Sequence, residues 1–235
     1  MPKAKSKPPV DRPATKAPGR TATKAPGRVA ANAAARSSAD AKPSARDRIL
    51  AAARSLLEGA GGSAEFNIDA VARQAGVTRM TVYYQFGGKP GLLEAIYDDI
   101  AARGEIGERL PLAFQQPTLE ASIDVLVAAF AHFWASERTI IRRIRHIGAL
   151  DPELAQSHGS RDRRRLETLR AVFARWSTGG GRRAAAIAER KAELIYALTS
   201  FEVYDVLASE GRSETEITKD LQYLALAAAG ISAPG

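Results

Sequence analysis

Between residues 44 and 103 the chain alternates amphipathic segments with breaks that contain glycine. In residues 44–58 the apolar side chains recur with the three-to-four-residue period of a helix that buries one face: Ile49, Ala52, Ala53, Leu56 and Leu57. Ser44 and Asp47 predict a capping pair at the start of this helix. Glycines at positions 59, 61 and 62 predict its end.

Two much shorter helices are predicted next, one on each side of Gly76. The first follows the N-cap Asn67 and has a narrow apolar face. The second follows the cap Thr78 and runs to about Phe86, where Gly87 and Gly88 end it. A longer helix then begins at Lys89, and its apolar face consists of Leu92, Leu93, Ile96, Tyr97 and Ile100.

Two short helices joined by a tight glycine turn, with a longer helix on each side, predict a helix-turn-helix. Once Val82 and Phe86 point inward, the outer face of the second short helix is polar, as a helix in the DNA major groove would be. Its Arg, Gln and Thr side chains are types that read base edges, whereas Tyr hydroxyls and Lys89 can reach phosphates. The alternative from pattern alone is an ordinary pair of core helices with half-buried tyrosines.

The rest of the chain keeps a helical period with no strand-like alternation, so we predict an all-α fold of about nine helices. One helix is expected after the cap Thr118, and another from Asp151-Pro152 to Trp176. Two more are expected over residues 182–208 and after Ser213, which forms a capping box with Glu216. We interpret the RDRRR run at 161–165 as a solvated face rather than a site.

Charge is concentrated at the N-terminus of this 235-residue chain. Residues 1–42 hold ten Lys/Arg against two Asp, whereas the remaining residues hold 24 basic and 24 acidic side chains, so the tail accounts for the formal net charge of +8. This tail has no aromatic residue and repeats ATKAPGR at 14–20 and 22–28, so we expect it to be disordered. It is either a polycation that adds salt-sensitive attraction to nucleic acid or a solubilising extension.

Several classes of protein are not supported. The chain has no cysteine, and its three histidines lack metal-ligand spacing, so no metal site is predicted. There is also no glycine-rich phosphate loop and no GxSxG motif, so we predict no cofactor and no enzyme activity. No apolar run approaches the roughly 20 residues of a membrane-spanning helix, and the basic N-terminus has no apolar segment behind it. The expected location is therefore the cytoplasm.

Residues 46–97 resemble the DNA-binding domain of TetR-family transcriptional regulators, through RDRILAAARSLL, IDAVARQAGV, TVYYQF and the KPGLL that opens the fourth helix. After the basic tail (1–42), the resemblance implies a helix-turn-helix DNA-binding domain (43–103) and a helical effector-binding and dimerisation domain (104–235). The residues it assigns to DNA contact are Thr78, Arg79, Thr81, Tyr83, Tyr84, Gln85 and Lys89. No contact is expected from Asp69, because a carboxylate there would repel a nearby phosphate.

By the same resemblance, the chain forms a homodimer through its last two helices and binds a palindromic operator in double-stranded DNA as a sequence-specific, nucleoid-associated repressor. A small-molecule effector in the C-terminal domain would release it. Candidate pocket residues, each of which could instead be ordinary core, are Phe130, Trp134, His146, Tyr196, Phe201 and Tyr204. The alternative function is that of an architectural nucleoid protein with no sequence preference.

Overall fold

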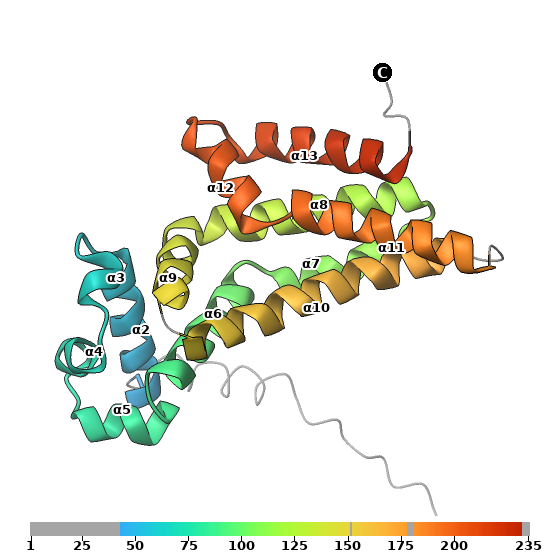
Figure 1. Cartoon of the computed structure of the whole chain (residues 1–235). Helices are drawn as coiled ribbons and strands as arrows, with labels where there is room; N and C mark the ends of the chain where they lie inside the picture. The colour runs from blue at the N-terminus through green and yellow to red at the C-terminus, as the bar shows by residue number, and fades with distance from the viewer. Residues whose placement is uncertain (1–42, 151, 178–180, 232–235) are drawn as a thin grey trace, which may run out of the picture. The chain divides into compact units, whose positions relative to one another are not determined.

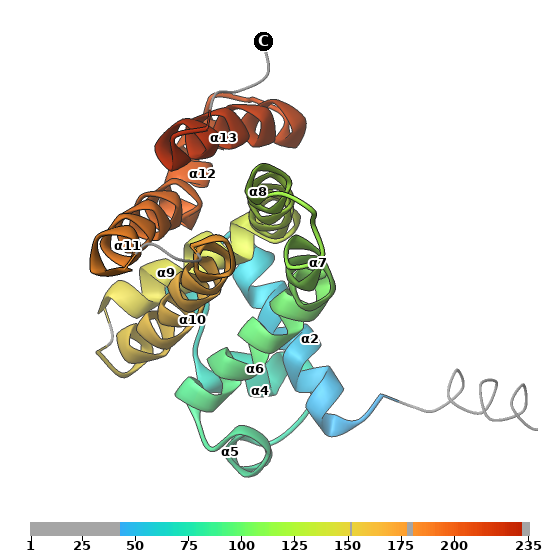
Figure 2. The same cartoon turned by 90° about the vertical axis from the view of Figure 1, so that its right-hand side faces the viewer.

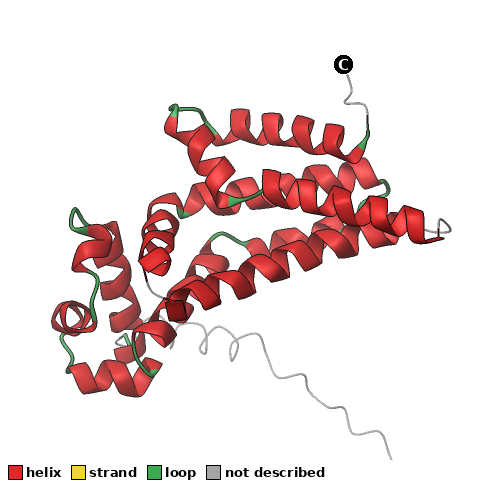
Figure 3. Ribbon diagram, in the orientation of Figure 1, coloured by secondary structure: helices red, strands yellow, loops and turns green. Residues whose placement is uncertain are grey.

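The structure of the protein, a computed structural model, describes residues 43–150, 152–177 and 181–231. These residues form helices and turns with no strand among them (Figure 3), which confirms the predicted all-α fold. The basic tail at 1–42 and the predicted cap Asp151 lie outside the described residues.

The helix-turn-helix segment begins where the sequence predicts. Its helices are α2 (Ala45–Glu58), α3 (Gly62–Glu65), α4 (Ile68–Ala75), α5 (Arg79–Phe86) and α6 (Lys89–Arg103). Ser44 and Asp47 form a reciprocal capping box on α2. The side chains of Asn67 and Thr78 cap α4 and α5 by accepting from backbone N–H groups three residues later.

Seven further helices follow: α7 (Ile106–Ala113), α8 (Leu119–Ser136), α9 (Arg138–Leu150), α10 (Pro152–Trp176), α11 (Gly181–Leu198), α12 (Phe201–Ser209) and α13 (Glu214–Ala229). The expectation of one continuous helix over 182–208 was wrong. Thr199 turns its hydroxyl back to the carbonyl oxygen of Ile195 at 2.8 Å, and Ser200 caps a new helix by accepting from the N–H of Val203. The capping box of Ser213 and Glu216 opens α13 as predicted.

The packing of these helices joins the helix-turn-helix to the rest of the described chain. Helix α2 packs against α4, α5 and α6 on one side and against α9 on the other. Helix α8 lies between α7 and α13, and α10 runs along α11 (Figures 1 and 2). One hydrophobic core runs from Ile49 in α2 to Ala229 in α13. The predicted domain boundary between residues 103 and 104 stays a prediction.

Helix α8 is long and apolar enough to cross a membrane when only its length and composition are considered, with a mean hydropathy of 1.2 over 18 residues. It was not singled out as a span from the sequence because Asp124 interrupts it. In the fold it is a core helix, with Ile123, Leu126, Val127 and Phe130 buried.

Candidate functional site

The turn between α4 and α5 fixes the direction in which α5 leaves the core. Gly76 has φ 64°, a left-handed conformation that glycine adopts without steric cost. The N–H of Val77 then bonds to the carbonyl oxygen of Ala72 at 3.0 Å, which closes the end of α4. Thr78 caps α5, and its hydroxyl lies 2.9 Å from that of Thr81. The predicted helix-turn-helix geometry is therefore present.

Helix α5 buries only a narrow face. Val82 and Phe86 are buried, whereas the side chain of Tyr84 is 88% exposed and that of Met80 is 72% exposed. Among the other predicted DNA contacts, Arg79 and Tyr83 are exposed, and Thr81 and Gln85 are half-buried. The helix contains no acidic residue, so its outer surface is polar and carries no negative charge of its own.

The C-terminal end of α5 is held by the neighbouring long helices α2 and α6. Arg46 of α2 donates to the carbonyl oxygen of Gln85 at 3.1 Å and places its guanidinium 4.5 Å from the ring centre of Phe86. At the start of α6, a Cβ on Gly91 would lie 1.9 Å from the carbonyl oxygen of Phe86, so only glycine fits there. The first turn of α6, which carries half-buried Lys89, therefore lies directly against the end of α5 and can receive a phosphate.

Arg79 is positioned by two neighbours on the exposed face. Its Nη1 lies 3.3 Å from Asp69 in α4, and its Nη2 donates to the Tyr83 hydroxyl at 3.2 Å. The bond to Tyr83 and the charge of Asp69 raise the pKa of Arg79 above its ordinary value. Sequence reasoning considered Asp69 only as a group that repels phosphate. A carboxylate ten residues from an arginine, across a turn, carries no periodic signal that would have revealed the pair.

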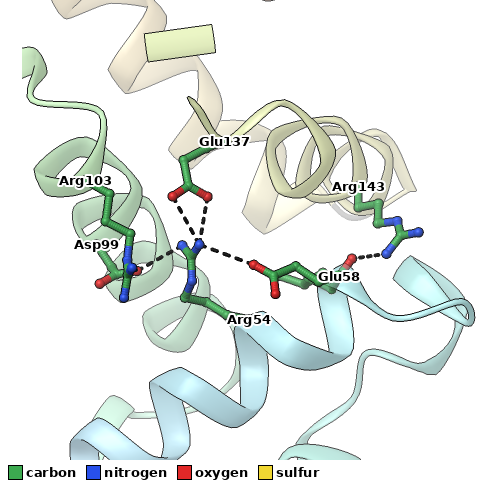
Figure 4. Close-up of polar contacts among 7 residues, drawn as sticks. Arg54, Glu58, Asp99, Arg103, Glu137 and Arg143 are labelled. Carbon is green, nitrogen blue, oxygen red and sulfur yellow. Dashed lines mark hydrogen bonds and ion pairs between the residues drawn. The ribbon is translucent and has the colours of Figure 1, made fainter. Parts of the chain in front are cut away.

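A half-buried arginine on α2, Arg54, joins the helix-turn-helix to the helices behind it (Figure 4). The Nη2 of Arg54 donates to both carboxylate oxygens of Glu137, at 2.8 and 3.1 Å, and its Nη1 donates to Asp99 of α6 at 3.0 Å. Glu58 and Arg103 extend the network at its exposed edge. Burial alone would lower the pKa of Arg54, but the hydrogen bond and charge of Glu137, together with the charges of Asp99 and Glu58, outweigh it and raise that pKa.

A second arginine ties α9 to the end of α2. Arg143 of α9 donates to the carbonyl oxygens of Leu57 and Gly59, the latter at 2.6 Å. Leu57 lies in the last turn of α2, where carbonyl oxygens lack partners within the helix, and Gly59 is the C-cap of that helix. Figure 4 shows Arg143 beside the Arg54 network, so both α9 and Glu137, the residue that precedes it, contact α2. The pattern of residue types along the chain gives no sign of either contact, because both join residues more than 80 positions apart.

Behind α6 lies a cavity of about 400 Å³, within the range of a small-molecule site. One wall is apolar and includes Phe130 and Trp134 of α8. The other carries charged side chains of α6, α9 and α10. Within the described residues no group of three or more His, Asp or Glu side chains could hold a metal ion.

Residues 49–96, which lie in helices α2 to α6, match the family described as bacterial regulatory proteins, tetR family. These residues form a TetR-family DNA-binding domain.

A known transcriptional regulator is also similar to part of this chain. The chain is 33% identical over 106 residues to the HTH-type transcriptional regulator EthR of Mycolicibacterium smegmatis, a match that covers 42% of this chain and 48% of EthR. The match therefore spans about half the length of that relative.

Two solved structures share the fold of this chain. A TetR-like transcriptional regulator from Rhodococcus sp. RHA1 has a TM-score of 0.59 at 22% identity, over 81% of this chain and 100% of the other. NalD, the secondary repressor of the MexAB-OprM multidrug efflux pump in Pseudomonas aeruginosa, has a TM-score of 0.55 at 19% identity, over 78% and 96%. The likeness extends well past the helix-turn-helix, so the helical arrangement of α7 to α13 is also shared.

The six predicted pocket residues do not come together at one place. Phe130 and Trp134 line the cavity. Phe201 and Tyr204 are buried in the core, where the ring of Phe201 packs 5.6 Å from that of Trp134. Tyr196 does not line the cavity, but its ring lies 4.0 Å from the guanidinium carbon of Arg165. His146 is exposed on α9.

The cavity contains charged residues that the sequence did not single out. The interpretation of 161–165 as a solvated face was wrong for Arg161 and Arg165, which line the cavity. Arg165 is only 7% exposed. Five polar residues in a row give no indication of which of them face inward, because a helix turns every residue to a different side.

Proposed function

We propose that the protein is a homodimeric, sequence-specific DNA-binding transcriptional regulator, and that it acts as a repressor released from its operator by a small-molecule effector. The observation that carries the proposal is the exposed, acid-free outer face of α5 on a TetR-family helix-turn-helix. Binding rather than catalysis is the proposed role.

Helix α5 would read the major groove with the residues predicted from the sequence. Arg79, with its guanidinium oriented by Asp69, is suited to a guanine edge, and Gln85 is suited to adenine. Tyr84 would lie against a thymine methyl or the backbone because nothing in the protein covers its ring among the described residues. Thr78, Thr81, Tyr83 and Lys89 would hold the helix in register through phosphate contacts.

The dimer would form through α11 and α13. These helices pack against each other and leave large apolar side chains exposed: Ile187 and Leu194 on α11, and Tyr223 and Leu224 on α13. A two-fold axis through this surface would pair two α5 helices. Their operator half-sites would then be spaced by about one helical turn of DNA, roughly 34–36 Å or a multiple of it.

Effector release would pass through α6. Asp98 of α6 lines the cavity, and the next residue, Asp99, binds Arg54 of α2. A molecule that changes the position of α6 would therefore act on the network that holds the helix-turn-helix. An effector lowers operator affinity only if it binds the non-binding conformer more tightly.

The DNA-binding role also accounts for the composition of the tail. Ten basic residues in 1–42 would add non-specific attraction to DNA by counterion release. The proposed location is the cytoplasm, in association with the nucleoid.

The proposal is tested by titrating bacterial genomic fragments with the protein in excess random competitor DNA. Tyr84→Ala should leave the free energy of unfolding unchanged, because the side chain is exposed, and should weaken retention of the specific fragments about tenfold, the loss of one good contact. Leu112→Ala on α7 is the matched control, since it also removes an exposed apolar side chain. Equal retention of every fragment by the wild type would instead support the architectural alternative.

A further inference from the structure

We propose that the cavity behind α6 binds a small organic carboxylate, with the carboxylate on Arg165 and the hydrocarbon part against the aromatic wall of α8. This proposal names the chemical class of the effector in the proposed function. Its expected effect on operator affinity rests on that function, but ligand binding can be measured without DNA.

The apolar part of the cavity suits a hydrocarbon group. Its wall consists of Ile106, Leu110, Phe130, Phe133, Trp134 and Ile141. The one polar atom of the Trp134 ring is already bonded, since its N–H donates to the carbonyl oxygen of Thr199 at 2.9 Å. The indole of Trp134 therefore offers a ligand an apolar surface and no free hydrogen-bond donor.

The charged part of the cavity has four arginines against two aspartates. The arginines are Arg145, Arg161, Arg164 and Arg165, and the aspartates are Asp98 and Asp162. Arg161 is paired with Glu94 and Asp98, at 2.5 and 2.9 Å. Arg145 is paired with Glu202 at 2.5 Å, and Arg164 is exposed. The buried arginine of this group, Arg165, has no carboxylate within hydrogen-bonding distance.

Arg165 is buried but incompletely bonded. Its Nη1 donates to the carbonyl oxygen of Tyr196 at 2.8 Å and to the Thr199 hydroxyl at 3.2 Å. Its Nε–H has no hydrogen-bond partner among the residues that the structure describes. Its nearest carboxylate, Asp162, is 3.7 Å away and lies at a similar 3.6 Å from Arg145, so it makes a hydrogen bond with neither.

A guanidinium in this position is costly until an anion reaches it. Burial lowers the pKa of Arg165, and the charge of Asp162 only partly offsets that. A buried charge without a bonded counter-ion is destabilising. A ligand carboxylate that accepts from the Nε–H and the remaining Nη group would supply the missing partner in the bidentate geometry that arginine favours.

The aromatic rings around Arg165 restrict how that anion can approach. The ring of Tyr196 lies 4.0 Å from the guanidinium carbon and that of Phe130 lies 5.8 Å away. Because both rings contact the guanidinium of Arg165, a ligand would have to approach the edge that carries its N–H groups. The same carboxylate would attract Arg161, which now binds Glu94 and Asp98 of α6. Ligand charge would therefore act directly on the helix that carries Asp99.

Calorimetric titration of the full chain with matched probes tests the site. Phenylbutyrate and decanoate should each bind at least about tenfold more tightly than phenylbutanamide and decanamide, the gain expected for hydrogen bonds to a charged group. Phenylbutylamine should not bind. Equal affinity for acid and amide, or no binding of either acid at millimolar concentration, would overturn the proposal.

Variants then assign the anion to Arg165. Arg165→Gln should abolish the preference for acid over amide, whereas Arg164→Gln, an exposed neighbour on the same cavity rim, should retain it. If Arg165→Gln does not fold, Asp162→Asn decides, because removing the competing carboxylate should tighten phenylbutyrate binding several-fold. Unchanged or weaker binding by Asp162→Asn would overturn the proposal, as would a folded Arg165→Gln that keeps the preference.

Operator affinity is measured separately with and without phenylbutyrate. A lower affinity in its presence supports the full inference. If the acid binds with the expected dependence on Arg165 but leaves operator affinity unchanged, the carboxylate site stands and the effector role in the proposed function fails.

Discussion

Glu137, which is only 9% exposed, accepts two hydrogen bonds from a single nitrogen of Arg54, at 2.8 and 3.1 Å. The first residue lies at the junction of α8 and α9 and the second lies on α2, so one buried ion pair joins the helix-turn-helix to the helices around the cavity. Asp99 of α6 shares the same guanidinium. A shift of α6 would therefore change the contacts of Arg54, the residue through which α2 is positioned.

Removing Arg54 should destabilise the protein strongly. Arg54→Met leaves Glu137 buried without a counter-charge, and the free energy of unfolding should fall by about 3 kcal/mol in urea titrations. The double variant Arg54→Met, Glu137→Gln should recover part of this loss, since no buried charge remains. Arg103→Met is the control, because Arg103 is an exposed partner of Asp99, and it should cost at most about 0.5 kcal/mol. Equal losses from both single variants would contradict the role given to Arg54.

Asp69 should influence specificity more than stability. Asp69→Asn removes the exposed ion pair with Arg79, so the free energy of unfolding should change by less than about 0.5 kcal/mol. Loss of a negative charge near the DNA should strengthen binding to random duplex and steepen the salt dependence by about one unit of slope. Discrimination between operator and random DNA should fall, because Arg79 is less well oriented. Filter-binding titrations at several salt concentrations measure both quantities. Glu108→Gln on α7 should change neither, and an unaltered specificity ratio for Asp69→Asn would show that the pair is incidental.

A charged residue in the proposed dimer surface should produce monomers. Leu194→Glu on α11 and Leu224→Glu on α13 place a carboxylate in a contact that must exclude water. Analytical ultracentrifugation should show half the wild-type mass with an unchanged helical circular-dichroism signal, and operator affinity should drop. Leu112→Glu, an equally exposed leucine on α7, should remain dimeric. Dimers that persist in both α11 and α13 variants would place the interface elsewhere.

Asp205 of α12 should make stability depend on acid pH. It accepts from Arg138 at 2.7 Å and from Arg142 at 2.6 Å. Burial alone would raise the pKa of Asp205, but these hydrogen bonds outweigh it and hold that pKa below its ordinary value. The stabilisation is therefore complete above about pH 4 and is lost as the pH falls through the lower folded-state pKa.

Asp205→Asn should accordingly lower the free energy of unfolding by about 1–2 kcal/mol at pH 7, with a smaller difference from the wild type at pH 2. Urea unfolding at the two pH values measures this. Asp220→Asn, which breaks the more exposed pair with Arg212, is the control and should have little effect at either pH. A deficit that stays the same at pH 2 would mean that packing, rather than charge, links α12 to α9.

The sequence predicted those helices that carry explicit boundary signals. Ser44, Asn67, Thr78, Thr118 and Ser213 all cap the helices expected of them, because a capping side chain acts within three residues of its own position. Helix α7 was not predicted. Its N-cap, Glu105, has φ 52° and makes no side-chain capping bond, and the helix contains Pro111. These local features disfavour a helix, so it is packing against α8 that stabilises it.

In the candidate site, too, features set by local sequence could be predicted, and features set by packing could not. The exposed face of α5 could be predicted because two apolar residues define its buried side and the rest must face outward. The orientation of Arg79, the Arg54 junction and the burial of Arg165 could not be, since each depends on partners in another helix. Arg165 in particular lies in a run of charged residues whose local pattern is that of a solvent-exposed helix.

Selection of binding sites from random duplex DNA tests the central claim most directly. The full chain and a form lacking residues 1–42 would each be selected at moderate salt. We predict the same two-fold symmetric consensus from both, with weaker overall affinity for the shortened form because the basic tail adds only non-specific attraction. If neither form yields a consensus, and binding disappears with the tail, the protein is not a sequence-specific regulator.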